Sequence, residues 1–177
     1  MRGKEGIEED EDYARWRESK IRWYPSLLEK IELRPFSLDF LFGPRQIGKT
    51  TLVKLLMKKL LQGTDPKSIF YYRCDKLTDF KELDEKIGEY LRMKKVEGIG
   101  TSYIFLDEVT FPKEWFRAVK YRIDLGDLKG DILFLTGSLS MFTKKEVEAF
   151  PGRRGLGDFI LHPVNFREFI KISNPSP

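Results

Sequence analysis

The chain has 177 residues and carries 32 Lys and Arg against 28 Asp and Glu, so its net charge is +4. That length supports one well-buried domain, and an apolar content of 41% excludes an intrinsically disordered chain. No apolar run approaches the ~18 residues that cross a bilayer. A single cysteine excludes an internal disulfide framework and favours a reducing compartment. We therefore expect a cytoplasmic protein with no membrane partner.

The first residues are predicted to form an arm ahead of the main domain. An acidic run, Glu8 to Asp12, is expected to be solvated, as blocks of like charge usually are. Trp16, Trp23 and Tyr24 are expected to pack the arm against the domain, and stacking on a nucleotide base is the alternative. Beyond Pro25, apolar residues at helical spacing predict one short helix.

From Phe36 onward, strand-like apolar runs alternate with segments of helical period. The strands are predicted at Phe36–Phe42, Ser68–Cys74, Ser102–Leu106, Asp131–Thr136 and Asp158–Leu161. The helices are predicted at Thr50–Leu61, Asp79–Met93, Pro112–Leu125 and Met141–Phe150. Strands that alternate with helices favour a parallel sheet covered on both faces. We therefore expect an α/β fold, a three-layer α/β/α P-loop NTPase core with a parallel five-stranded sheet.

The stretch "GPRQIGKT" after the first strand matches the pattern G-x-x-x-x-G-K-[ST] and leads into an amphipathic helix. Glycines let the backbone N–H groups approach a polyphosphate, and the positive end of the helix dipole adds to the attraction. Lys49 supplies a full charge to the phosphates, and the Thr50 hydroxyl is a ligand for Mg²⁺. The predicted nucleotide-binding residues are Gly43, Pro44, Arg45, Gln46, Ile47, Gly48, Lys49, Thr50 and Thr51.

A second motif, "YIFLDE", ends a strand that is apolar on both faces. Asp107 is expected beside the Gly-rich loop, where it orients the Mg²⁺ shell, and Glu108 is close enough to activate a water. The alternative for Glu108 is a solvated loop carboxylate. An intervening strand separates the two motifs in the sequence, which predicts the strand order 5-1-4-3-2. Asp75, after that intervening strand, is expected at the same edge of the sheet.

Three further residues are candidates for catalysis. Ser138, at the end of "ILFLTGS", is expected to position the attacking water, and a Ser- and Gly-rich turn is the alternative. Arg153 and Arg154 follow in the loop "PGRRGLG". Either one is a candidate arginine finger that reaches the nucleotide of a neighbouring subunit. Their alternative is a solvated basic turn or a contact with a phosphate backbone.

Five segments in order, "GPRQIGKTT", "YIFLDEV", "FLTGS", "GRRG" and "LHPVNFREF", resemble archaeal and bacterial ATPases of the AAA+ superfamily whose P-loop reads GPRQ/R-x-GKT. The resemblance covers Trp23 to Ile170. It implies that Lys49 and Thr50 belong to Walker A, Asp107 and Glu108 to Walker B, and Ser138 to sensor 1. Members of that group usually continue into a helical lid and a C-terminal nuclease-like domain, and the family suggests DNA as a partner.

The resemblance also sets the expected domain boundaries. These are an arm over 1–22, the ATPase core over 23–172, and a tail or truncation point over 173–177 without the helical lid. The main functional hypothesis is a Mg²⁺-dependent ATP hydrolase that acts on an unknown partner as a homo-oligomer. A nucleotide-dependent switch with little turnover is the second hypothesis, and a P-loop kinase is the third. ATP is favoured over GTP because no N/T-K-x-D motif is present.

Overall fold

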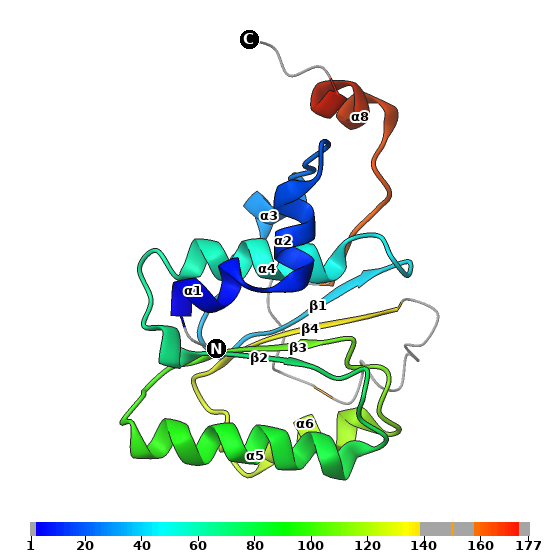
Figure 1. Cartoon of the computed structure of the whole chain (residues 1–177). Helices are drawn as coiled ribbons and strands as arrows, with labels where there is room; N and C mark the ends of the chain where they lie inside the picture. The colour runs from blue at the N-terminus through cyan, green and yellow to red at the C-terminus, as the bar shows by residue number, and fades with distance from the viewer. Residues whose placement is uncertain (1–2, 139–149, 151–157, 174–177) are drawn as a thin grey trace.

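The computed structural model describes residues 3–138, 150 and 158–173. It contains a twisted sheet with helices on both faces, and Figure 1 shows these three layers. The sheet consists of β1 Leu38–Gly43, β2 Ile69–Arg73, β3 Tyr103–Asp107, β4 Ile132–Ser138 and β5 Phe159–Ile160. All pairings are parallel and the order is β2-β3-β4-β1-β5, which confirms the predicted fold class and strand order.

One face of the sheet is covered by α4, with the N-terminal helices packed above it, and the other face by α5 and α6 (Figure 1). The helices are α1 Gly3–Glu8, α2 Glu11–Glu18, α3 Leu27–Lys30, α4 Lys49–Leu60, α5 Phe80–Val96, α6 Trp115–Asp124 and α8 Phe166–Ser173, with a 3₁₀ turn, η1, at Pro66–Ser68. Within the described residues, no helix has the length and apolar character to cross a bilayer. The helix expected over 141–150 lies outside the described residues except for Phe150.

The central strands are buried from end to end because both their faces are covered. Alternate side chains therefore enter two separate apolar clusters. In β4, Leu133 and Leu135 face the cluster under α5 and α6, whereas Phe134 faces the cluster under α4. This alternation with a period of two places Thr136, which follows Leu135, on the face covered by α4.

The N-terminal arm is folded against α4, and its acidic run is solvated only in part: Glu9 and Glu11 are exposed, as predicted, whereas Asp10 and Asp12 are partly buried in ion pairs. Ile7 and Tyr13 are buried, so the arm contributes apolar side chains to the cluster under α4. The carboxylates of the run form ion pairs with the core: Glu8 with Lys58, Asp10 with Lys54, and Asp12 with Arg73. The acidic run faces a cationic surface of the domain, and that complementarity keeps it in place.

Of the aromatic residues predicted to pack the arm against the domain, Trp16 and Trp23 do so, whereas Tyr24 is exposed and contacts Trp16. Trp16 donates its indole N–H to the carbonyl of Trp23 over 3.0 Å, and its ring lies 4.7 Å from the ring of Tyr24, edge to face. Trp16 and Trp23 are half-buried against the cluster under α4.

Gly43 ends β1 at a point where the chain beyond β5 passes very close. A Cβ atom at this position would lie 2.9 Å from the carbonyl oxygen of Leu161 and 3.2 Å from Cγ2 of Ile47. The backbone of Leu161 is held there because its N–H donates to the carbonyl of Phe42 over 2.8 Å. Gly43 is therefore required by close packing of two strands, in addition to its place in the loop.

We predict that Gly43→Ala lowers the free energy of unfolding by about 1–3 kcal/mol, because the added methyl group forces the β1 and β5 backbones apart. Denaturation by urea measures this change. Gly63→Ala is the matched control: nothing lies within 4 Å of its Cβ position, so this substitution is expected to be neutral or stabilising. Equal unfolding midpoints for both variants would contradict the packing argument.

Candidate nucleotide site

The loop between β1 and α4 has the backbone shape of an anion cradle. Gln46 and Gly48 have φ angles of 61° and 101°, both in the left-handed region. Such residues turn successive N–H groups toward one side of a loop, which makes a concave site for anions. Gly48 is also the N-cap of α4, so the free N–H groups and the positive dipole end of that helix open at the same place.

The ammonium group of Lys49 lies inside this loop. Its side chain is only 2% exposed, and Nζ donates to the carbonyls of Gly43 and Pro44 over 3.3 and 3.0 Å. On its other side, Nζ is 3.5 Å from Oε1 of Glu108. A buried ammonium needs such acceptors, and the three of them hold the Lys49 charge where the loop amides converge.

Asp107 ends β3 and is fully buried. It accepts hydrogen bonds from the Thr50 hydroxyl over 2.7 Å, from the Tyr71 hydroxyl over 3.0 Å, and from the Thr136 hydroxyl. These donors come from α4, β2 and β4. Burial, followed by the nearby charge of Asp107, raises the pKa of Tyr71 above its ordinary value, so this phenol remains a donor.

Glu108 is the first residue after β3 and has a φ of 53°. A non-glycine residue in this region carries backbone strain. Its N–H donates to Oγ1 of Thr136 over 2.9 Å, so one threonine side chain holds both acids. The side chain of Glu108 is 17% exposed, and it reaches the same space as Lys49.

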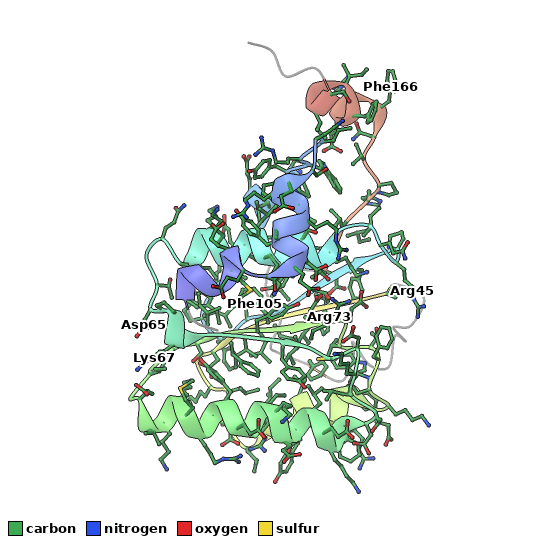
Figure 2. All side chains as sticks on the ribbon, viewed as in Figure 1. Arg45, Asp65, Lys67, Arg73, Phe105 and Phe166 are labelled. Atoms are coloured by element: carbon green, nitrogen blue, oxygen red, sulfur yellow. The ribbon has the colours of Figure 1, made fainter. Side chains whose placement is uncertain are left out.

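These groups border a pocket of about 510 Å³. Its lining residues are Asp12, Arg15, Arg45, Gln46, Gly48, Lys49, Thr50, Thr51, Arg73, Asp75, Glu108 and Phe111. Figure 2 shows Arg45 and Arg73 at the same end of the sheet, where the carboxyl ends of the strands lie. In open α/β sheets this is the edge at which ligands bind.

Most of the predicted binding residues meet at this pocket, although not all in the same role. Residues 45, 46 and 48–51 line it, and the carbonyls of Gly43 and Pro44 hold Lys49. The side chain of Ile47 packs into the cluster under α4 instead. Asp75 lines the pocket and forms an ion pair with Arg73 over 2.8 Å.

Of the remaining predicted catalytic residues, Ser138 is the one that the structure describes. Ser138 is buried at the end of β4, in register with Gly43, and its role stays a prediction. Arg153 and Arg154 lie outside the described residues. Sequence reasoning missed Thr136 and Tyr71, and the period of two along β4 and β2 is the signal that places both on the face of Asp107.

The residues present fit a magnesium ion. The Thr50 hydroxyl and the Asp107 carboxylate are hard oxygen donors in contact with each other, next to the loop amides. Mg²⁺ is usually bound by one or two carboxylates together with substrate phosphates and waters. Thr50 and Asp107 would hold the ion directly or through water, and the ion would neutralise charge on the phosphates.

Comparison with known proteins agrees with this geometry. A family model described as AAA domain matches residues 35–170, and the chain belongs to this family of P-loop ATPase-like proteins. The chain is also similar to the uncharacterized protein MJ1637 of Methanocaldococcus jannaschii, with 28% identity over 173 residues. The match covers 90% of this chain and 34% of the relative, so the chain spans about a third of that protein's length.

We predict that Thr136→Val lowers the free energy of unfolding by about 1–3 kcal/mol, because it leaves a buried carboxylate without one donor and the Glu108 N–H without its acceptor. Urea denaturation measures the loss. Thr136→Ser keeps the hydroxyl and is expected to retain most of the stability. A valine variant as stable as the native protein would show that these hydrogen bonds contribute nothing.

Proposed function

We propose that this domain binds ATP with Mg²⁺ and hydrolyses the bond to its terminal phosphate. The observation that carries the proposal is the meeting of Lys49, Glu108 and the Thr50–Asp107 pair at the mouth of one anion cradle. These groups come from separate segments of the chain. Each supplies a different requirement of phosphoryl transfer, namely positive charge, metal ligands and a base.

In the proposed reaction the loop amides and the Lys49 ammonium bind the β- and γ-phosphates. Glu108 accepts a proton from a water molecule while the water oxygen attacks the γ-phosphorus. The bond between that phosphorus and the bridging oxygen breaks, and ADP leaves with the electron pair. Asp107 and Thr50 would hold the Mg²⁺ ion, which would neutralise charge on the phosphates. Glu108 then returns its proton to solvent.

Nucleotide binding has a direct consequence for the Lys49–Glu108 contact. The two side chains neutralise each other at 3.5 Å, and incoming phosphates compete with Glu108 for the ammonium. The phosphates carry more negative charge than one carboxylate, so Lys49 is expected to turn toward them. Glu108 is thereby released to act on water only when nucleotide is present.

The same contact favours a second candidate function, a nucleotide-dependent switch with little turnover. If Glu108 stays with Lys49 after nucleotide binds, no base is available and the bound triphosphate persists. Such a domain signals through the shape of its nucleotide-bound state. The two functions differ in one measurable property, the rate at which bound ATP is lost.

The proposal also includes the assembly of subunits and the partner on which the protein acts. We infer a homo-oligomer in which Arg153 or Arg154 of one subunit completes the site of the next, with Ser138 beside the attacking water. The similarity to AAA+ ATPases whose P-loop reads GPRQ-x-GKT supports DNA, or an attached nuclease-like domain, as the recipient of the work. The net charge of +4 is in line with an anionic partner.

We predict that Lys49→Ala abolishes measurable nucleotide binding. Glu108→Gln is expected to bind nucleotide at least as tightly as the native protein, because a competitor for the Lys49 ammonium is removed, and to lose turnover by about 10²–10⁴-fold, because the base is removed. Equilibrium binding of a fluorescent ATP analogue and single-turnover hydrolysis measure the two effects. The assays use the purified chain, alone and with DNA.

The outcomes separate the two functions. Tight binding with a turnover rate that Glu108→Gln leaves unchanged would contradict the hydrolase and support the switch. Unchanged nucleotide affinity in Lys49→Ala would contradict both, because each requires the cradle to hold phosphates.

A further inference from the structure

A buried ion pair joins the N-terminal arm to the helix that follows the P-loop. Nζ of Lys54 in α4 lies 2.8 Å from Oδ2 of Asp10, and the lysine side chain is only 1% exposed. Lys54 interrupts an otherwise apolar stretch of α4, "LVKLLM". Burial lowers the pKa of Lys54, and the carboxylate of Asp10 opposes that shift. Asp10 is thus the counter-ion that lets a charge remain at this depth.

Lys54 in turn contacts a residue that is hydrogen-bonded to Asp107. Its ammonium lies over the ring of Tyr71, 3.3 Å from the centroid, and such a contact is attractive when it is desolvated. The hydroxyl of the same tyrosine donates to Oδ2 of Asp107 over 3.0 Å. Asp10, Lys54, Tyr71 and Asp107 therefore form one continuous series of contacts from the arm to the metal-binding acid.

The arm also reaches the pocket directly. Asp12 and Arg15, on the first and second turns of α2, are among the pocket-lining residues. Asp12 lies 3.2 Å from the guanidinium of Arg73, which ends β2 at the pocket rim. Figure 1 shows α2 above α4 on the side of the sheet that carries the P-loop helix. The arm accordingly borders the same space as the phosphate cradle.

A second ion pair between the arm and α4 shows what a merely structural contact looks like. Glu8 pairs with Lys58 over 2.9 Å, one helical turn beyond Lys54. Both partners are more than 40% exposed, and solvent weakens such a pair. Exposed ion pairs of this kind, together with apolar packing, are enough to hold the arm in place. The buried pair of Asp10 and Lys54 differs, because its contacts continue through Tyr71 to Asp107, the proposed Mg²⁺ ligand.

We propose that the arm is part of the nucleotide site: Asp10, acting through Lys54 and Tyr71, orients the Asp107 carboxylate toward Mg²⁺. This inference rests on the proposed function and deepens it. Asp10, Lys54 and Tyr71 are positioning residues, because none of them touches the nucleotide or the ion. Residues that orient a metal ligand in this way typically change metal affinity about 10–100-fold when altered.

The test is the Mg²⁺ concentration that gives half-maximal binding of a non-hydrolysable fluorescent ATP analogue. Tyr71→Phe keeps the ring beneath Lys54 and removes only the hydroxyl, and it is expected to raise this concentration by about 10-fold.

Asp10→Asn keeps the acceptor that caps α2, where Oδ1 accepts from the Tyr13 N–H over 3.1 Å, and removes the charge. It is expected to shift Mg²⁺ dependence in the same direction.

Two further measurements separate positioning from a general loss of structure. Analogue binding in EDTA is expected to stay within about twofold of the native value, because the phosphate cradle is unchanged. The double variant is expected to shift Mg²⁺ dependence by less than the product of the single effects, because both substitutions break one series of contacts. Thermal unfolding verifies that each variant is folded.

The matched control is Glu8→Gln, which removes the exposed pairs of the arm residue Glu8 with Lys58 of α4 and with Arg17 of α2, and is expected to leave Mg²⁺ dependence unchanged. If the native chain binds the analogue with Mg²⁺ and both Tyr71→Phe and Asp10→Asn match it, the inference fails and the proposed function stands. An equal shift in Glu8→Gln also overturns the inference, because any loosening of the arm would then suffice. A native chain that binds no analogue overturns the proposed function as well.

Discussion

The candidate site depends on one buried carboxylate. Asp107 is fully enclosed, and a charge in that position is tolerated only when hydrogen-bond donors surround it. The donors are three hydroxyl groups, supplied by α4, β2 and β4. Satisfying this one group fixes the P-loop helix relative to three neighbouring strands. The loop between β1 and α4 and Asp107, the proposed Mg²⁺ ligand, are therefore held in register by the same contacts.

Several departures from ordinary protein structure lie at this edge of the sheet. Gln46 and Glu108 have left-handed backbone conformations, and Lys49 and Lys54 are buried cations. Each feature has a cost in free energy, which the rest of the fold must offset. The two apolar clusters on either side of the sheet provide that stability. Such a division, a regular core with an irregular edge, is typical of a site that binds charged ligands.

The sequence was sufficient to predict the sheet because its central strands are apolar on both faces, a pattern that only parallel, fully covered strands require. The sequence also singled out the loop of residues 43–50 and the acids Asp107 and Glu108, and the structure brings them together, while their roles stay predictions. Element ends were less accurate: α5 extends to Val96 rather than Met93, where Gly98, at a φ of 66°, terminates it. That end depends on backbone conformation, which helical periodicity does not report.

The docking of the arm and the contact of Tyr71 with Asp107 could not be predicted in the same way. A run of acidic residues has no intrinsic partner, and its attachment to α4 arises from cations that are distant in the sequence. In the sequence, nothing distinguishes Tyr71 from any other aromatic residue of an edge strand. The register of β2 with β3 is needed to place it near Asp107. Thr136 is different: its position in β4 relative to Phe134 already places it on the face of Asp107.

The docking of the arm has a consequence for how the protein folds. Glu8 and Lys58 are 50 residues apart, and Tyr71 and Asp107 are separated by 36. The sheet itself pairs residues that are further apart still, such as Leu38 of β1 with Leu133 of β4. The arm can dock only on a surface that α4 and β2 have already built. A chain whose sheet has formed but whose arm has not docked therefore lacks the wall of the proposed nucleotide pocket that Asp12 and Arg15 supply.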